Sequence, residues 1–329
     1  MGGGRGAPRV TSNISPLRGK GGFMKIGLAL GSGSARGWAH IGVIQALEEL
    51  GIHPDVVCGT SVGALVGAAC ASGHLERLEA RLRALTRLNT ATYFTIGVAG
   101  GGLVNREKLH ALFEECVADP DAAIEDLPVK YAAVATDMET GGEYWLRKGS
   151  VLQAVWASIS LPGLFPPVHY HDRWLFDGGL VNPVPVSVCR ALGADLVIAV
   201  NLNGELVGRH NAAKRRRERE KEREKERERE GEGDFVERIA ATIRQHGLFP
   251  EWPARPSMFG TVACAIDIVQ DRITRSRMAG DPPDAVLTPR LTHIGLLEFY
   301  KAEEAIEEGK ACVERMRPVI DALFSHSPS

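Results

Sequence analysis

The sequence lacks any uncharged apolar run that reaches the roughly 18 residues of a membrane-spanning helix. It also lacks a CxxC pair and any grouping of cysteine and histidine at the spacing of a zinc site. We therefore expect the six cysteines to be reduced core residues, and we expect neither a metal nor a cofactor. The formal net charge of −2 argues against a nucleic-acid-binding surface spread over the chain, and we expect no nucleic-acid partner.

The two ends of the chain carry little that could build a core. Residues 1–23 contain no acidic side chain and no apolar segment of the kind that drives secretion, and Met24 directly precedes the apolar stretch KIGLAL. We interpret residues 1–23 as a disordered tail, residues 325–329 as a second short tail, and residues 24–324 as one domain. A cytoplasmic location follows as an expectation.

A strongly charged run interrupts this domain. Residues 214–230 read KRRREREKEREKERERE, with 10 basic, 7 acidic and no apolar residues. A segment without apolar side chains cannot join a hydrophobic core, so we interpret residues 209–234 as a disordered, solvated insertion. Electrostatic contact with an anionic membrane or a nucleic acid remains the alternative for this run.

Short β-branched runs alternate with helical stretches over residues 25–203, which is typical of an α/β fold with a mainly parallel sheet. The pattern predicts strands at residues 25–30, 55–59, 130–138, 143–149, 173–179, 195–202 and 285–291. It predicts helices at residues 38–50, 62–72, 75–88, 106–117, 151–158, 185–192, 235–245, 258–279 and 296–324.

A glycine-rich loop, GSGSARG at residues 31–37, follows the first of these strands. Consecutive backbone N–H groups at the start of a helix attract negative charge. The loop departs from the dinucleotide motif GxGxxG, because Arg36 takes the place of the third glycine and Gly37 follows it. Asp55 also begins the next strand, whereas a ribose-binding carboxylate belongs at its end. Alone, the loop fits a nucleotide phosphate, another anion or a structural turn.

The second motif, GTSVG at residues 59–63, lies between a predicted strand and a predicted helix. A serine in this strand–turn–helix context is typical of a nucleophile elbow. Gly59 and Gly63 relieve crowding in the tight turn, which places the N–H of Val62 at the helix N-terminus, where an anion is stabilised. We therefore predict Ser61 as a nucleophile.

A serine nucleophile needs a base, and the sequence offers two arrangements. Asp177 ends a predicted strand and precedes Gly178 and Gly179, which allow another backbone segment to approach closely. It could act alone, or it could orient His293 in a triad of the order Ser, Asp, His.

These three motifs, in this order, resemble the patatin-like phospholipase family, and within it the bacterial branch related to the neuropathy target esterase domain. The resemblance extends over residues 24–311 and includes the stretches ATDMETG, SISLPGLFPPV and FYKAEEAIEEGK. It implies a three-layer α/β/α sandwich and a catalytic Ser-Asp dyad. The implied activity is that of a serine esterase or lipid acyl hydrolase, of phospholipase A or lysophospholipase type, working through an acyl-enzyme without cofactor or metal.

The resemblance also assigns roles to individual residues. Ser61 would be the nucleophile and Asp177 the general base. The oxyanion hole would consist of backbone amides of the loop residues Gly31, Ser32, Gly33 and Ser34. The other motif residues would support the site; they are Arg36, Gly37, Gly59, Gly63, Gly178 and Gly179. Ser32 is a departure, since family members commonly have glycine there.

The roles of two further residues can be narrowed at this stage. Arg36 either braces the loop or meets a phosphate-bearing head group. We expect His40 to be packed and not catalytic. The implied partner is a lipid or other ester, which would bring the protein into peripheral contact with the inner membrane surface. The alternatives are a nucleotide-binding protein that uses the glycine-rich loop, or a weakly active family member with a regulatory role.

Overall fold

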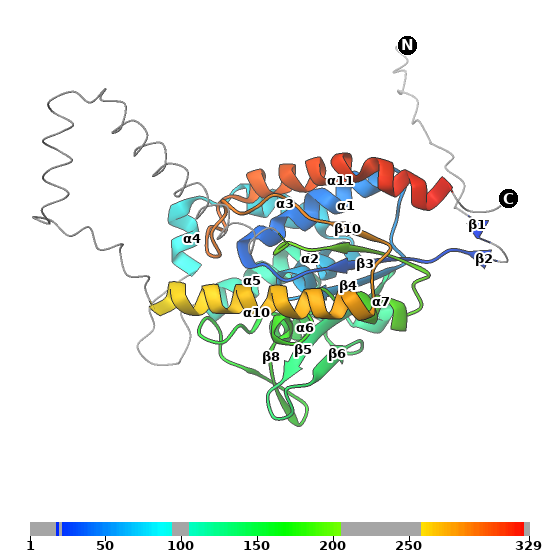
Figure 1. Ribbon diagram of the computed structural model, residues 1–329. Coiled ribbons are helices and arrows are strands. Elements are labelled where there is room, and N and C mark those ends of the chain that lie inside the picture. Colours follow the sequence, from blue (N-terminus) through cyan, green and yellow to red (C-terminus); the bar gives the residue numbers. More distant parts are fainter. Residues whose placement is uncertain (1–17, 20–21, 94–104, 205–257, 326–329) are drawn as a thin grey trace, which may run out of the picture.

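The computed structural model describes residues 18–19, 22–93, 105–204 and 258–325, and an eight-stranded sheet lies at its centre (Figure 1). The strand order is β10-β9-β3-β4-β5-β8-β7, with β6 paired to β5. Strands β10, β9, β3, β4 and β5 are parallel, whereas β6 and β8 are antiparallel to β5 and β7 is antiparallel to β8. The strands are β3 (Ile26–Leu30), β4 (Val56–Thr60), β5 (Lys130–Asp137), β6 (Glu143–Leu146), β7 (Val168–Tyr170), β8 (Arg173–Asp177), β9 (Leu196–Val200) and β10 (Ala285–Leu287).

The central strands are buried on both faces, which explains why they read as nearly continuous apolar runs. In β3, Leu28 and Leu30 join one hydrophobic cluster while Ala29 joins the other. In β9, Ile198 and Ala199 divide in the same way. Successive side chains of each strand therefore point to opposite faces of the sheet and join two separate cores.

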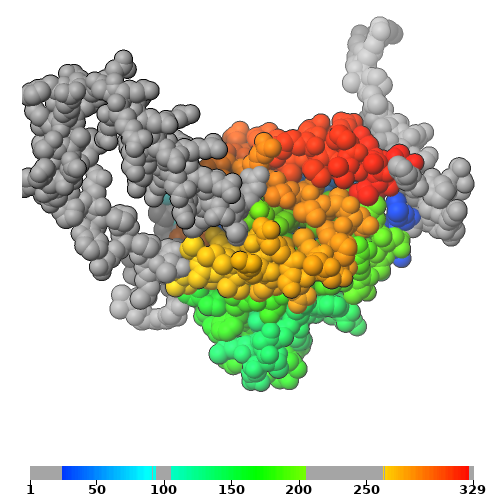
Figure 2. All heavy atoms as spheres, viewed as in Figure 1, coloured from blue at the N-terminus to red at the C-terminus, as the bar shows by residue number. Residues whose placement is uncertain are grey.

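Helices cover both faces and complete a three-layer α/β/α sandwich. On one face lie α1 (Ala39–Glu49), α2 (Val62–Ala71), α3 (Leu75–Arg83), α5 (Arg106–Cys116), α6 (Val151–Ile159) and α11 (Ala302–Ser325). On the other lie α7 (Val186–Ala191) and the last turns of α10 (Met258–Gly280), through Met278. Figure 2 shows α10, in yellow to orange, lying across the molecule between α11 in red and the green β5–β8 region.

The remaining elements are short. The helix α4 (Arg87–Tyr93) follows α3, and the described part of the chain has three 3₁₀ turns, η1 (Ser34–Trp38), η2 (Ile124–Asp126) and η3 (Gly178–Leu180). A small antiparallel pair, β1 (Arg18–Gly19) and β2 (Gly22–Phe23), lies within the expected N-terminal tail. All six cysteines are free, and within the described ranges no helix is long and apolar enough to cross a membrane.

All seven predicted strands are present, although β6 ends at Leu146 and β10 at Leu287, earlier than expected, and two predicted helices are wrong in their bounds. The helix expected over residues 75–88 breaks into α3 and α4, and the last helix begins at Ala302 instead of residue 296. The structure adds β7, which the sequence did not predict. The charged run at 214–230, the helix expected at 235–245 and most of the two tails lie outside the described residues.

Two glycines let α1 and α11 pack with their backbones in contact (Figure 1). A Cβ on Gly42 would lie 1.9 Å from the Ile306 carbonyl oxygen, and a Cβ on Gly309 would lie 2.1 Å from that of Ala39. Backbone cannot yield as a flexible side chain does, so any larger residue must separate the helices. This contact accounts for Gly309 in the interior of an amphipathic helix.

We expect Gly309→Ala to lower the free energy of unfolding by about 1–3 kcal/mol, the usual cost of overpacking a core. Urea unfolding followed by circular dichroism measures this. Gly280→Ala is the matched control, because a Cβ there meets no atom within 4 Å, and it should leave stability unchanged or slightly improved. Equal stability of both variants would show that the two helices can separate without cost.

Candidate active site

Ser61 lies in the sharp turn between β4 and α2, with backbone angles φ 58° and ψ −125°. A side chain in this region is strained, and such strain is typical of a nucleophile elbow. The flanking glycines are required by close contacts. A Cβ on Gly59 would lie 2.3 Å from the Gly63 carbonyl oxygen, and a Cβ on Gly63 would lie 2.2 Å from that of Leu30. The turn therefore holds the Ser61 side chain at the N-terminus of α2.

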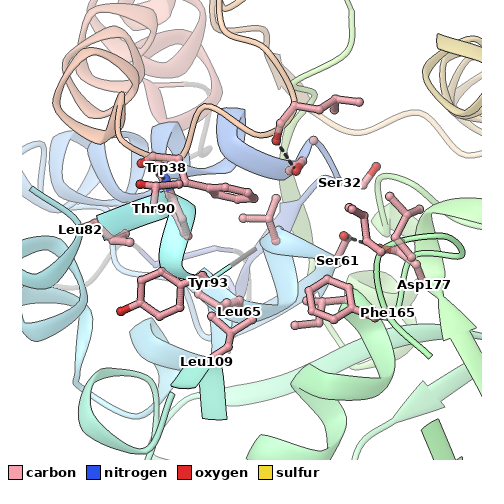
Figure 3. A pocket seen from close by; sticks show the side chains of 18 of the residues that line it. Ser32, Trp38, Ser61, Leu65, Leu82, Thr90, Tyr93, Leu109, Phe165 and Asp177 are labelled. Carbon is pink, nitrogen blue, oxygen red and sulfur yellow. Dashed lines mark hydrogen bonds between the residues drawn. The ribbon is translucent and has the colours of Figure 1, made fainter. Parts of the chain in front are cut away.

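Asp177, at the end of β8, meets this serine (Figure 3). The Ser61 hydroxyl donates a 2.5 Å hydrogen bond to Oδ2 of Asp177, and the Gly179 N–H donates a 2.7 Å bond to Oδ1. Burial of the carboxyl raises the pKa of Asp177 to about 6, while the hydrogen bonds from Ser61 and Gly179 act in the opposite direction. The two predicted catalytic side chains are thus in direct contact.

The segment 158–160 holds both members of this pair in place. The buried Ser158 hydroxyl accepts a 2.8 Å hydrogen bond from the Ser61 N–H and donates a 2.6 Å bond to the Val134 carbonyl. Two residues later, the Ser160 carbonyl accepts a 3.0 Å bond from the Asp177 N–H. The sequence did not reveal these roles; its only trace is the SIS triplet in the stretch SISLPGLFPPV.

The glycine-rich loop offers fewer free amides than expected. The Gly31 N–H donates to the Val200 carbonyl at 3.1 Å, and the Ser32 N–H donates to the Pro183 carbonyl at 2.8 Å. These bonds extend the pairing beyond the end of β3 and occupy both donors. The amides of Gly33 and Ser34 have no acceptor in the part of the chain that the structure describes, and both residues line the cavity beside Ser61. The candidate oxyanion donors in this loop therefore narrow to Gly33 and Ser34.

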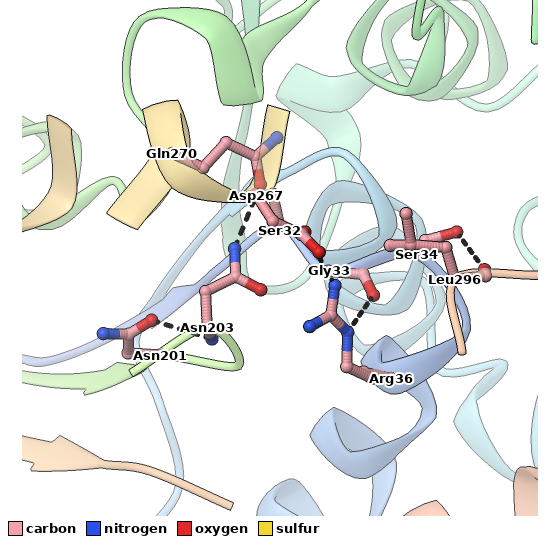
Figure 4. A network of polar contacts seen from close by, with 9 residues as sticks. All are labelled: Ser32, Gly33, Ser34, Arg36, Asn201, Asn203, Asp267, Gln270 and Leu296. Carbon is pink, nitrogen blue, oxygen red and sulfur yellow. Dashed lines mark hydrogen bonds and ion pairs between the residues drawn. The ribbon is translucent and has the colours of Figure 1, made fainter. Parts of the chain in front are cut away.

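Arg36 lies behind the loop and not at the cavity. Its side chain is buried, with Nε donating to the Gly33 carbonyl at 3.2 Å and the guanidinium 2.9 Å from Asp267 of α10 (Figure 4). Because a trans peptide directs its C=O and N–H to opposite sides, holding the Gly33 carbonyl also orients the Ser34 N–H away from Arg36. These contacts match the bracing role.

The two histidines that the sequence raised do not reach the dyad. His40 is fully buried behind the loop, with Nε2 2.8 Å from the Gly31 carbonyl, and burial lowers its pKa to about 4. His293 is half exposed and pairs with Glu304 at 2.7 Å. The structure therefore brings Ser61 and Asp177 together without His293.

Asp55 lies far from the glycine-rich loop along the sheet. Its carboxylate accepts a 2.8 Å hydrogen bond from the Ile26 N–H at the start of β3, whereas the loop follows the end of that strand. The geometry thus offers no ribose-binding carboxylate at this position beside the loop.

An apolar cavity opens beside the dyad and contains about 1100 Å³ of empty space, including its mouth. Its polar end holds Ser61 and Asp177 (Figure 3), and Gly33 and Ser34 of the loop also line it. The rest is lined mainly by aliphatic and aromatic side chains, among them Leu65, Leu82, Leu109, Leu112, Phe113 and Phe165. A cavity of this kind accepts a long apolar group whose reactive end lies at the serine.

Residues 296–299, expected to be helical, instead form part of the cavity wall. The Leu296 carbonyl accepts a 2.6 Å hydrogen bond from the Ser34 hydroxyl and a 3.2 Å bond from the Ala35 N–H. The Trp38 indole N–H donates to the Phe299 carbonyl at 3.1 Å, and the two rings pack 5.8 Å apart. This segment therefore fixes η1, which follows the glycine-rich loop.

Comparison with known proteins defines the class. The family model for patatin-like phospholipase matches residues 28–190, a range that includes the loop, the elbow and Asp177. An uncharacterized NTE family protein of Mycobacterium tuberculosis is 32% identical over 93% of this chain and 92% of its own length. Human patatin-like phospholipase domain-containing protein 6 is 35% identical over 55% of this chain and 13% of its own. Lysophospholipase nte1 of Aspergillus fumigatus is 34% identical over 54% of this chain and 12% of its own.

The chain therefore belongs to the patatin-like phospholipase family, and its full-length similarity is to NTE family proteins. The family and these relatives support a hydrolase that acts on lipid esters.

Proposed function

We propose that this protein is a serine lipid acyl hydrolase of phospholipase A or lysophospholipase type, with Ser61 and Asp177 as a catalytic dyad. The observation that carries the proposal is the 2.5 Å hydrogen bond from a strained elbow serine to a buried carboxylate at the polar end of an apolar cavity. A hydroxyl so placed can attack an ester whose acyl chain occupies the cavity.

In the first half of the reaction, Oγ of Ser61 bonds to the ester carbonyl carbon while Oδ2 of Asp177 takes the hydroxyl proton. The raised pKa makes this carboxylate a stronger base than an ordinary aspartate, and it still leaves the group ionised at pH 7. The negative charge that develops on the carbonyl oxygen is met by the amides of Gly33 and Ser34 and by the N-terminus of α2.

Collapse of this intermediate breaks the ester bond. The departing alcohol takes the proton from Asp177, and the acyl group remains on Ser61. Water then attacks the carbonyl carbon of the acyl-enzyme and gives a proton to Asp177. Collapse of this second intermediate breaks the bond to Oγ of Ser61 and releases the fatty acid, while Asp177 returns the proton to Oγ. Every step uses side chains and backbone of this chain, so the proposal requires no cofactor.

The chemistry of the cavity favours a lipid as the substrate. Its apolar lining suits a fatty acyl chain, and one relative is named a lysophospholipase. A lipid substrate in turn implies peripheral contact with a membrane, which we place at the cytoplasmic face as part of the proposal.

Incubation with phosphatidylcholine and with lysophosphatidylcholine, followed by mass spectrometry of the products, tests the proposal. We expect free fatty acid from at least one of them, with kcat/KM falling about tenfold per pH unit below about 6, because Asp177 must be ionised to act. His293→Ala is the control and should keep full activity. Release of no fatty acid from either lipid, or loss of activity in His293→Ala, would overturn the dyad proposal.

A further inference from the structure

Gln270 of α10 lies beside both the glycine-rich loop and the dyad, outside residues 28–190 that match the family model. It is 5% exposed and lines the same cavity as Ser61 and Asp177. The mechanism proposed above does not use it. A buried primary amide next to a reactive serine therefore needs a physical account.

The oxygen of this amide is already engaged (Figure 4). Oε1 of Gln270 accepts a 2.9 Å hydrogen bond from the Ser32 hydroxyl and a 3.0 Å bond from Nδ2 of Asn203. In the structure the accepting atom is Oε1, and Nε2 forms the other end of the amide. The nitrogen consequently points away from Asn203, as Figure 4 shows.

The nitrogen lies on the side of the dyad. A Cβ on Gly179 would be 2.4 Å from Nε2 of Gln270 and 3.0 Å from Oδ1 of Asp177, so both groups lie close to the same point. Within the described residues, Nε2 donates to no acceptor. This nitrogen is not among the fully buried polar atoms that lack a partner, and Gln270 lines the cavity, so Nε2 can donate to a group that enters there.

Two contacts hold this nitrogen in position. One is the pair of hydrogen bonds on Oε1, which prevents the amide from rotating. The other is the ion pair between Asp267, one turn earlier on α10, and Arg36 behind the loop, at 2.9 Å. Helix α10 is thus fixed to the loop at two points on one face, and a donor so fixed needs little reorganisation during a reaction.

We propose that Nε2 of Gln270 donates a hydrogen bond to the substrate's carbonyl oxygen as it becomes negative, and that it supplements the amides of Gly33 and Ser34. The inference rests on the proposed ester hydrolysis and adds a catalytic side chain to it. Its position accounts for the departure at Ser32: the hydroxyl that replaces glycine there is the group that orients the Gln270 amide.

Two substitutions separate donation from scaffolding. Gln270→Glu keeps an oxygen for Ser32 and Asn203, removes the N–H and adds a negative charge, whereas Gln270→Met removes donor and acceptor without adding charge. We expect each to lower kcat by about 10²–10³-fold at pH 8, the usual effect of losing one oxyanion donor, with KM little changed. Gln153→Glu, an exposed position on α6, is the matched control and should keep full activity.

The outcomes are distinct. Wild-type kcat in Gln270→Glu would show that Gln270 only scaffolds the loop, and wild-type kcat in Gln270→Met would show that the glutamate acted through its charge; either result overturns the inference while ester hydrolysis stands. Loss of activity accompanied by a lost near-ultraviolet circular dichroism spectrum in both variants would assign Gln270 to folding and overturn it too. A wild-type protein that hydrolyses neither lipid would overturn the proposed function and this inference together.

Discussion

Replacing Ser61 by alanine is expected to lower ester hydrolysis by on the order of 10⁴–10⁶-fold, the range seen when a serine nucleophile is removed. Alanine retains the Cβ, so the strained turn is unchanged. The N–H of residue 61 still donates to Ser158, which keeps the elbow in place. The loss should therefore fall on chemistry and leave the fold intact. Fluorophosphonate labelling followed by peptide mass spectrometry should place the adduct on Ser61 of the wild type and on no residue of the variant.

Ser72→Ala serves as the matched control for this experiment, because Ser72 follows the same helix α2. Among the described residues its buried hydroxyl has no hydrogen-bond partner, so its removal should leave activity unchanged and should not lower stability. A fully active Ser61→Ala protein, or labelling at another residue, would contradict the assignment of the nucleophile.

The elbow could be predicted from sequence because its physical causes are local. Glycines two residues to either side of Ser61, between an apolar strand and a small-residue helix, are needed by contacts within the turn itself and with the adjoining strand end. Asp177 was a harder prediction, since it lies 116 residues further along the chain. The sequence placed it at a strand end, but its contact with Ser61 depends on β5 lying between β4 and β8.

Other parts of the site depend on pairings that no local pattern encodes. The amides of Gly31 and Ser32 are occupied because β9 and the chain before α7 lie beside the loop. Gln270 reaches the site only through the placement of α10, 238 residues after Ser32. The last helix begins late because Leu296 and Phe299 contact η1 instead of continuing the helical pattern. In each case tertiary contact overrides or supplements the local signal.

Asp177→Asn is expected to inactivate the enzyme and at the same time to stabilise it. Removing a general base costs about 10²–10⁴-fold in rate. Asparagine has nearly the same shape and can still accept the Gly179 N–H, so packing is kept. The wild type, however, holds a buried carboxylate whose folded-state pKa of about 6 exceeds the ordinary value. Between the two pKa values the folded state binds more protons than the unfolded state, so wild-type stability falls as the pH rises through this window.

The size and pH dependence of the gain follow from the same shift. The folded-state pKa is about 6 and the ordinary value is about 3.9. This difference predicts that Asp177→Asn raises the free energy of unfolding by about 3 kcal/mol at pH 7, by about half of that at pH 5, and by little below pH 4. Urea unfolding of both proteins at pH 7 and pH 5 measures it, with Asp172→Asn on the exposed β7–β8 turn as a control that should show no gain. An inactive Asp177→Asn protein that is no more stable than the wild type at pH 7 would mean that the buried carboxylate is fully compensated by its hydrogen bonds. The acid limb of the rate profile would then have to arise from another group.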